Sequence, residues 1–132
     1  MYEFTISGNP VPWKSHGGYG KRSFSPRYKE REFYRWTIKQ QMSGLSKISG
    51  AIALRVIYHI TIPGSYSIKK KRAILSGQIY PIKRPDLTNY NKFLEDCLTG
   101  LVWEDDSQIV RIEASKQYSS ETKTVIFVNI LS

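Results

Sequence analysis

The segment from Lys83 to Ile109 constrains the fold most tightly, because it joins one amphipathic helical pattern to most of the acidic side chains. It holds six of the eleven acids in a chain of formal net charge +9: Asp86, Glu95, Asp96, Glu104, Asp105 and Asp106. Carboxylates gathered in one stretch repel one another, and a hard divalent cation relieves that repulsion by taking their oxygens. The segment therefore predicts a Mg²⁺ site suited to cutting phosphodiesters, within a basic surface that holds nucleic acid.

The first half of this segment predicts a helix that Pro85-Asp86 opens and Gly100 closes. At 100° per residue, one buried apolar stripe forms from Leu87, Tyr90, Leu94, Cys97 and Leu98. The neighbouring stripe carries the polar residues Asp86, Asn89, Lys92 and Asp96, while Thr88 and Glu95 fall near the back of the wheel. The helix thus buries one face in a core, and the adjacent face carries the candidate site residues.

Structural explanations compete with the catalytic one for two of these residues. Asp86 after a proline is a natural N-cap, and Lys92 with Asp96 has the spacing of a surface ion pair. The acids that follow the helix weaken these explanations. A strand from about Leu101 would bring Asp105 or Asp106 near Asp86, although adjacent acids alternate in direction, so only one would face it.

Length and composition limit the classes of protein. A chain of 132 residues predicts one domain, and the single Cys97 excludes an internal disulfide framework and a cysteine-rich zinc site. We expect a soluble cytoplasmic protein, because no apolar run spans a membrane and the start lacks a signal-peptide pattern. A pI near 9.7 favours a polyanionic partner, most simply nucleic acid, although an ordinary basic surface is the alternative.

The rest of the chain predicts an α/β (α+β) fold over residues 1–132, with a mixed, mainly antiparallel sheet and two principal helices. Alternation of apolar and polar residues indicates strands over 2–7, 51–62, 108–118 and 122–131. A second helix should begin at Ser25-Pro26 and run to about Met42, after a glycine-rich loop. The last strand is apolar on both faces, so it lies inside the sheet or is covered by another subunit.

Basic residues flank the acidic segment. The run from Lys69 through Lys70 and Lys71 to Arg72 predicts a mobile loop or a short helix that becomes ordered on a polyanion. A solubilising surface loop is the alternative. Together with this run, the residues expected to contact nucleic acid are Lys14, Lys83 and Arg84.

The central motif closely resembles the signature of RusA-type Holliday junction resolvases. That signature has Asp-x-Asp-Asn-x-x-Lys at a helix start, an Asp one turn later, a small-residue turn, and Asp-Asp-x-Gln-Ile. Here the matching residues read RPDLTNYNKFLEDCLTG and then VWEDDSQI. The N-terminal Gly-x-Pro stretch, the Ser-Pro helix start and the lysine-rich loop are also similar, so the resemblance covers nearly the whole chain.

The resemblance implies a homodimer, encoded by a bacterium or a phage, that binds four-way junctions. It implies paired symmetric nicks that depend on Mg²⁺, with Mn²⁺ able to substitute. Asp86 matches the first metal-binding acid, Lys92 the catalytic lysine and Asn89 the asparagine at the site. Asp105 and Asp106 match the later acidic pair, whose second member is the better-supported ligand.

One position departs from the pattern. Thr88 stands where the family carries its second essential acid, and threonine supplies no charged oxygen. Either the site uses fewer acids or another carboxylate substitutes, and the candidates are Glu95, Glu104 and Glu113. The departure leaves a second hypothesis open, which is a junction-binding protein with weak or no cleavage.

Overall fold

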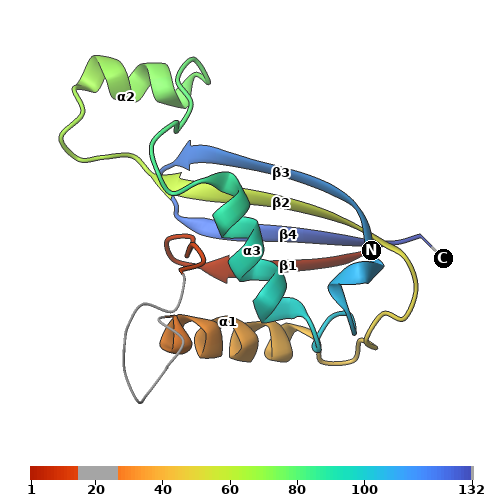
Figure 1. The fold of residues 1–132 in the computed structure, drawn as a ribbon. Coiled ribbons are helices and arrows are strands. Elements are labelled where there is room, and N and C mark those ends of the chain that lie inside the picture. Colours follow the sequence, from red (N-terminus) through yellow and green to blue (C-terminus); the bar gives the residue numbers. More distant parts are fainter. Residues whose placement is uncertain (15–26, 132) are drawn as a thin grey trace.

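The computed structural model describes residues 1–14 and 27–131 of the chain, and Figure 1 shows their arrangement. The secondary-structure elements, in chain order, are β1 (Tyr2–Ser7), α1 (Tyr28–Gln41), β2 (Ile52–Thr61), α2 (Ile68–Leu75), α3 (Leu87–Leu98), the 3₁₀ turn η1 (Asp106–Gln108), β3 (Ile109–Ser119) and β4 (Lys123–Ile130). The four predicted strands and both predicted helices are therefore present. The expected start of the second helix at Ser25-Pro26 lies outside the described residues.

The strands form one mixed sheet in the order β1-β4-β2-β3. β4 is antiparallel to both β1 and β2, whereas β2 and β3 run parallel. Val56 in the centre of β2 lies opposite Ile126 on one side and Ala114 on the other. Two of the three pairings are antiparallel, so the mixed, mainly antiparallel sheet is confirmed. β4 lies between two strands, which confirms the interior position that its apolar character allowed.

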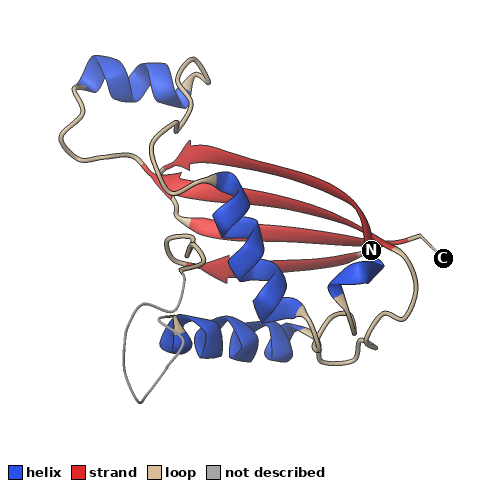
Figure 2. Ribbon diagram, viewed as in Figure 1, coloured by secondary structure: helices blue, strands red, loops and turns tan. Residues whose placement is uncertain are grey.

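Both α1 and α3 pack on the same face of the sheet, as Figure 2 shows by colour. The strands supply alternate buried side chains to that face, because successive residues of a strand point to opposite sides. The most deeply buried of them are Phe4, Ile6, Ile52, Leu54, Val56, Tyr58, Ile126 and Val128. The alternation that predicted β1 and β2 therefore corresponds to the core.

Helix α3 packs against the sheet and against α1, so it is buried on two sides. Tyr90, Leu94, Cys97 and Leu98 belong to the predicted apolar stripe, and all four are buried. Phe93 is buried as well, edge-on against Tyr34 of α1 at 5.2 Å between ring centroids. A helical wheel shows one stripe, whereas contact with two neighbours widens the buried surface, which is why Phe93 was missed.

Arg35 of α1 completes the carboxyl end of α3. One guanidinium nitrogen, Nη1, donates to the carbonyl oxygens of Cys97 and Thr99 at 3.0 and 3.1 Å. These carbonyls belong to the end of the helix, where no further turn supplies donors. The two helices are thereby joined by polar contacts as well as by the ring contact.

The chain turns sharply after α3, and the expected strand from about Leu101 is wrong. α3 ends at Leu98, Thr99 caps it, and Gly100 adopts a φ of 90°, which favours glycine. The Gly100 amide donates to the Trp103 carbonyl at 2.6 Å, which closes a tight turn. Trp103 is fully buried, so the chain folds back onto the end of α3 and does not run along the helix to its start.

The lysine-rich run forms the short helix that was one of its two predicted states. α2 begins at a capping residue, Ser67, whose hydroxyl accepts from the Lys70 amide at 3.1 Å. Figure 1 shows α2 beyond one end of the strands, away from the other two helices. Among the helices of the described residues, none is long and apolar enough to cross a membrane.

Candidate functional site

Three acids converge where the last turns of α3 meet η1. Burial raises the pKa of Glu95, and the negative charges of Asp106 and Asp96 raise it further. Burial also raises the pKa of Asp96, with Asp106 adding to the effect and with Arg31 and Lys92 opposing it. We call Glu95, Asp96 and Asp106 the acid cluster. Their carboxylates lie close enough to disfavour one another's charged forms.

Asp106 is held in place by the buried turn. The indole Nε1 of Trp103 donates to Asp106 Oδ1 at 3.3 Å, and the Thr99 hydroxyl donates to the same oxygen. Trp103 is fully buried, so its indole is a fixed donor. Both bonds reach Oδ1, which leaves Oδ2 of Asp106 without a donor in the part of the chain that the structure describes. A carboxylate with one anchored oxygen is suited to present the other to a ligand.

Asp105 and Gln108 have structural contacts that explain the rest of the Asp-Asp-x-Gln motif. Asp105 caps η1 by accepting from the Ser107 amide at 3.5 Å. Gln108 Oε1 accepts from the amides of Glu104 and Asp105, and its Nε2 donates to the carbonyls of Ile48 and Gly50. One side chain therefore satisfies four backbone groups. The two acids of the pair therefore have different roles: Asp106 belongs to the acid cluster, whereas Asp105 stabilises the turn.

Asp86 lies away from this cluster, so the expected convergence of Asp86 with Asp105 or Asp106 is wrong. Asp86 occupies the N-cap position of α3, and its exposed side chain makes no capping hydrogen bond. Thirteen residues separate it from Thr99, which contacts Asp106, and a helix of that length rises roughly 20 Å. One ion cannot contact both acids at that separation. The physical reason is the buried Trp103 turn, which returns the chain to the near end of α3.

The arrangement fits an open divalent-metal site. Among the described residues, no group of three His, Cys, Asp or Glu side chains is placed to enclose an ion. Mg²⁺, however, commonly uses only one or two protein carboxylates and completes its shell with water and phosphate. Asp106 with Glu95 or Asp96 supplies such a pair, and the pKa of each partner is raised by burial and by the neighbouring carboxylates, even though Arg31 and Lys92 lower that of Asp96. The donor set therefore suits a hard cation.

Lys92 is positioned by an aromatic ring. Its Nζ lies 3.4 Å from the centroid of the Trp13 ring, within the range of a cation–π contact. The Trp13 amide donates to the carbonyl of Asn89 at 2.9 Å. This hydrogen bond attaches the segment that follows β1 to α3. The alternative ion pair of Lys92 with Asp96 is not among the ion pairs of the described residues. The position of the Lys92 ammonium group is thus set by the Trp13 ring and not by an ion pair with Asp96.

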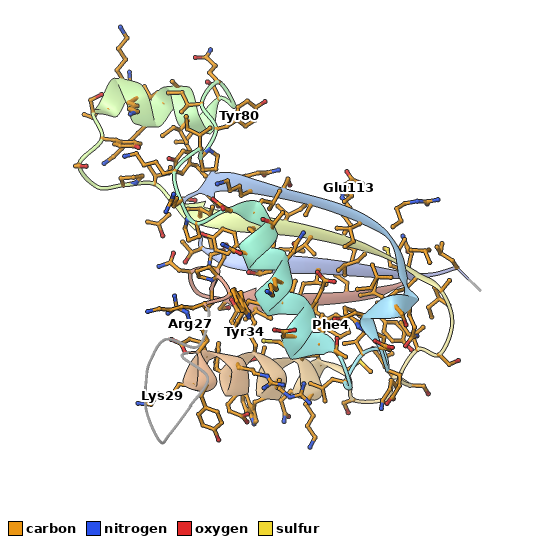
Figure 3. All side chains as sticks on the ribbon, in the orientation of Figure 1. Phe4, Arg27, Lys29, Tyr34, Tyr80 and Glu113 are labelled. Carbon is orange, nitrogen blue, oxygen red and sulfur yellow. The ribbon has the colours of Figure 1, made fainter. Side chains whose placement is uncertain are left out.

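Two neighbouring cavities share Asp96 and Asp106, and together we call them the site groove. The first, of about 440 Å³, is lined mainly by cations and aromatic rings: Trp13, Lys14, Arg27, Arg31, Phe93, Asp96, Thr99 and Asp106. The second, of about 370 Å³, is lined by Thr88, Asn91, Lys92, Glu95, Asp96, Asp106 and Ile112. Figure 3 shows Arg27 on the side of the groove formed by α1. Cations thus stand beside the acids.

Of the three acids that could substitute at Thr88, Glu95 is the one that lines a cavity with it. The two residues are seven apart, or about two helical turns, and they line the same cavity. Of the other candidates, Glu104 pairs with Lys47 at 2.9 Å and Glu113 pairs with Arg55 at 3.9 Å. Neither lines the site groove. Glu95, which the helical wheel placed near the back of the helix, therefore faces the site, because η1 and β3 cover that side of α3.

The basic residues fall into two groups. Lys14 lines the first cavity, next to the acid cluster. Lys69, Lys70 and Arg72 are exposed on α2, and Lys83 and Arg84 are exposed in the segment that precedes α3. Lys71 is half-buried, with its Nζ donating to the Gly64 carbonyl at 3.4 Å. The predicted bases thus lie in two places: Lys14 beside the acid cluster, and the others on α2 and in the segment that leads into α3.

Several site residues were not expected from the sequence. Trp13, Arg27, Arg31 and Thr99 all line the groove. Trp13 is next to Lys14 in the N-terminal segment, and Thr99 lies inside the motif RPDLTNYNKFLEDCLTG. A position within or beside a motif was therefore a signal for these two residues. No spacing rule links Arg27 or Arg31 to α3, because they reach the groove only through packing between elements.

Comparisons with known proteins identify the family of the chain. The family model described as "Endodeoxyribonuclease RusA" matches residues 6–129, which is nearly the whole chain. The chain is also similar to "Uncharacterized protein YqaN" of Bacillus subtilis (strain 168), with 30% identity over 137 residues. That alignment covers 98% of this chain and 96% of the relative.

We expect Gln108→Ala to lower the free energy of unfolding by about 1–3 kcal/mol, because four backbone groups lose their partner. Chemical denaturation followed by tryptophan fluorescence measures the change. Gln117→Ala, at an exposed position of β3, is the matched control and should alter stability little. Equal stability of the two variants would show that the motif glutamine does not brace the turn.

Glu95→Gln should raise the melting temperature at neutral pH in metal-free buffer. The pKa of Glu95 is raised, so the native state keeps a proton that the unfolded chain has released. Its contribution to stability therefore falls as pH rises from below the ordinary pKa through the raised one. The gain of the variant should disappear in acid, where Glu95 is protonated in both states.

The gain should be small, since Glu95 is only half-buried. Glu121→Gln, at an exposed acid beyond β3, serves as the control in the same pH series. A variant that melts below the parent protein at neutral pH would contradict mutual repulsion within the acid cluster.

Proposed function

Because the chain belongs to the RusA endodeoxyribonuclease family, we propose that it is a Mg²⁺-dependent endonuclease that resolves Holliday junctions or related branched DNA by paired symmetric nicks. Such an activity serves DNA recombination and repair. The observation that carries the proposal is the acid cluster in a groove whose other walls are cationic. Acids that hold a metal and bases that hold phosphates are the two requirements of phosphodiester cleavage.

Asp106 with Glu95 or Asp96 would hold the metal. When bound, a divalent cation makes a water nucleophilic at neutral pH and neutralises charge at the phosphorus. The protein's part is to hold Asp106 through Trp103 and Thr99, so that its free oxygen stays aimed at the groove. Mn²⁺ should substitute for Mg²⁺, since both take oxygen ligands.

Lys92, Arg27 and Arg31 act on the phosphate. Lys92, placed over Trp13, stabilises negative charge that develops on the scissile phosphate or positions the attacking water. Arg27 and Arg31 line the adjoining cavity, where they would bind a flanking phosphate. Asn89 has a supporting role, because its carbonyl anchors the segment that carries Trp13.

Glu95 takes over the charge that Thr88 lacks. It shares a cavity with Thr88 and contributes its carboxylate from the same helix two turns later. Asp86 is retained as an essential acid at the far end of α3, following the family resemblance. Asp105 contributes indirectly by bracing η1 beside Asp106.

DNA would lie across the site groove and the start of α3. Lys14 sits in the groove, while Lys69, Lys70, Lys71, Arg72, Lys83 and Arg84 surround the approach. Paired nicks on opposite strands require two sites related by a two-fold axis, so we propose a homodimer.

A junction-binding protein with little cleavage is the second candidate. Thr88 favours it, because the position faces the groove and supplies no charge. A titration of Mg²⁺ or Mn²⁺ into a four-way junction assay separates the two. Nicks that appear only with metal rule out the pure binder, whereas tight binding without nicks at any metal concentration rules out the nuclease.

Asp106→Asn and Asp86→Asn should each reduce the rate of cutting by at least about 100-fold, the first because a metal-site charge is lost and the second because the family resemblance makes Asp86 an essential acid. Junction binding in a gel-shift assay should survive. Glu3→Gln, at an exposed acid of β1, is the control and should cut normally. Normal cutting by Asp86→Asn alone would confine the site to the acid cluster, and normal cutting by both would refute the assignment.

Junction affinity should fall steeply with salt, since Lys and Arg contacts to phosphate release counterions. Replacing Lys69 and Arg72 by alanine should lower the slope of log affinity against log salt by about 2, or 0.9 per lost contact. Lys29 and Lys39, exposed on α1, provide the matched double control. An unchanged slope for the α2 variant would remove α2 from the DNA surface.

A further inference from the structure

Residues 65–84, which include α2, form a projection that we call the arm. Figure 1 shows it beyond one end of the strands, next to the start of α3. The arm contains no acid, and its cations are Lys69, Lys70, Lys71, Arg72, Lys83 and Arg84. Such a segment is complementary to a polyanion over its whole length.

The base of the arm is anchored to the sheet by defined contacts. Tyr66 lies edge-on against Tyr118 of β3, with 6.4 Å between ring centroids. Lys70 Nζ lies 3.8 Å from the centroid of the Tyr66 ring, and Lys83 Nζ approaches the same ring at 5.5 Å. Ile74 is 5% exposed, so α2 also has an apolar contact of its own.

Hydrogen bonds from β3 fix the segment that connects α2 to α3. Lys116 of β3 donates from its Nζ to the carbonyls of Lys83 and Pro85, at 3.0 and 3.1 Å. Pro81 is buried. These contacts hold the backbone of the segment against the edge of the sheet. Side chains that take no part in them are left exposed to solvent.

Two of those side chains are large, apolar and open to water. Ile82 is 89% exposed, the highest value among the large hydrophobic residues of the described chain, and Tyr80 is 71% exposed. Lys83 and Arg84 follow directly. Apolar groups held outward between cations mark a binding surface for a partner that is both apolar and anionic.

We propose that Ile82 and Tyr80 pack on nucleobases exposed at the branch point of DNA, while the neighbouring cations hold the flanking phosphates. This inference rests on the proposed function for the identity of the partner. Bases within a continuous duplex are stacked on both sides, whereas a branch point offers base faces to apolar or aromatic side chains. The arm thereby distinguishes branched DNA from linear DNA.

The chain geometry places this contact near Asp86, at the start of α3. Four residues separate Ile82 from Asp86, so their Cα atoms lie at most about 14 Å apart. DNA strands advance about 3.4 Å per nucleotide, so a phosphate near the start of α3 lies within roughly four nucleotides of a base on Ile82. The position of the branch would then set which phosphate reaches the groove.

The test compares four variants in metal-free buffer. The alanine pair carries Ile82→Ala with Tyr80→Ala, and the conservative pair carries Ile82→Leu with Tyr80→Phe. The control pair carries Ile130→Ala with Leu45→Ala, which are exposed apolar residues outside the arm, at 49% and 42%. The fourth is Lys69→Ala with Arg72→Ala. Thermal unfolding confirms that each variant folds.

The alanine pair should lose roughly 5- to 100-fold in affinity for a four-way junction and less than about twofold for linear duplex. The conservative and control pairs should behave like the parent protein. The cation pair should weaken both DNAs alike. A 2-aminopurine at the branch point should gain fluorescence when the parent protein unstacks it, and the alanine pair should abolish that gain.

Equal losses on junction and duplex, or no loss on either, would overturn the inference. Sedimentation with phosphatidylglycerol vesicles tests the other apolar, anionic partner, and loss of vesicle binding with unchanged junction affinity would overturn it in favour of a membrane surface. If the parent protein cuts DNA but the alanine pair discriminates normally, only this inference fails. If the parent protein never cuts but the junction preference depends on the pair, only the nuclease proposal fails.

Discussion

The buried indole of Trp103 is the contact on which the site depends. Its burial forces the chain back onto the end of α3, and its Nε1 holds Asp106 in the direction of Glu95 and Asp96. Removing so large a buried side chain typically costs about 3–5 kcal/mol, so the turn is as well fixed as the core. The arrangement of the acid cluster thus follows from the packing of the turn.

Electrostatic repulsion within the acid cluster determines which kind of ligand this geometry favours. The acid cluster is unfavourable by itself, because burial and like charge raise the pKa of Glu95 and of Asp96. The same repulsion favours a bound cation, since a metal removes a cost that the empty cluster bears. Arg31 and Lys92 compensate Asp96 only in part, and Lys92 sits over the Trp13 ring without forming an ion pair with Asp96. Acids and cations therefore lie close together in the site groove.

The division of labour within the Asp-Asp-x-Gln motif also follows from tertiary contacts. Alternation along an expected strand predicted that Asp105 and Asp106 face different ways; that strand does not form, but the two acids do make different contacts. Alternation did not indicate that Asp105 caps η1 or that Gln108 ties the turn to residues nearly sixty positions earlier. A motif can thus combine one reactive side chain with several that only hold it, and a sequence pattern does not separate the two kinds.

The sequence by itself determined the elements, because hydrophobic periodicity of two or about 3.6 residues reports which face is buried. It predicted four strands, the α3 helix ending at Gly100, the mixed sheet and an acidic segment among bases. Only the tertiary structure decided that Asp106 meets Glu95 and not Asp86, and that Trp13 and Arg31 reach the groove. Local periodicity is a property of neighbours along the chain, whereas these pairings depend on how the Trp103 turn and α1 pack against α3 in space.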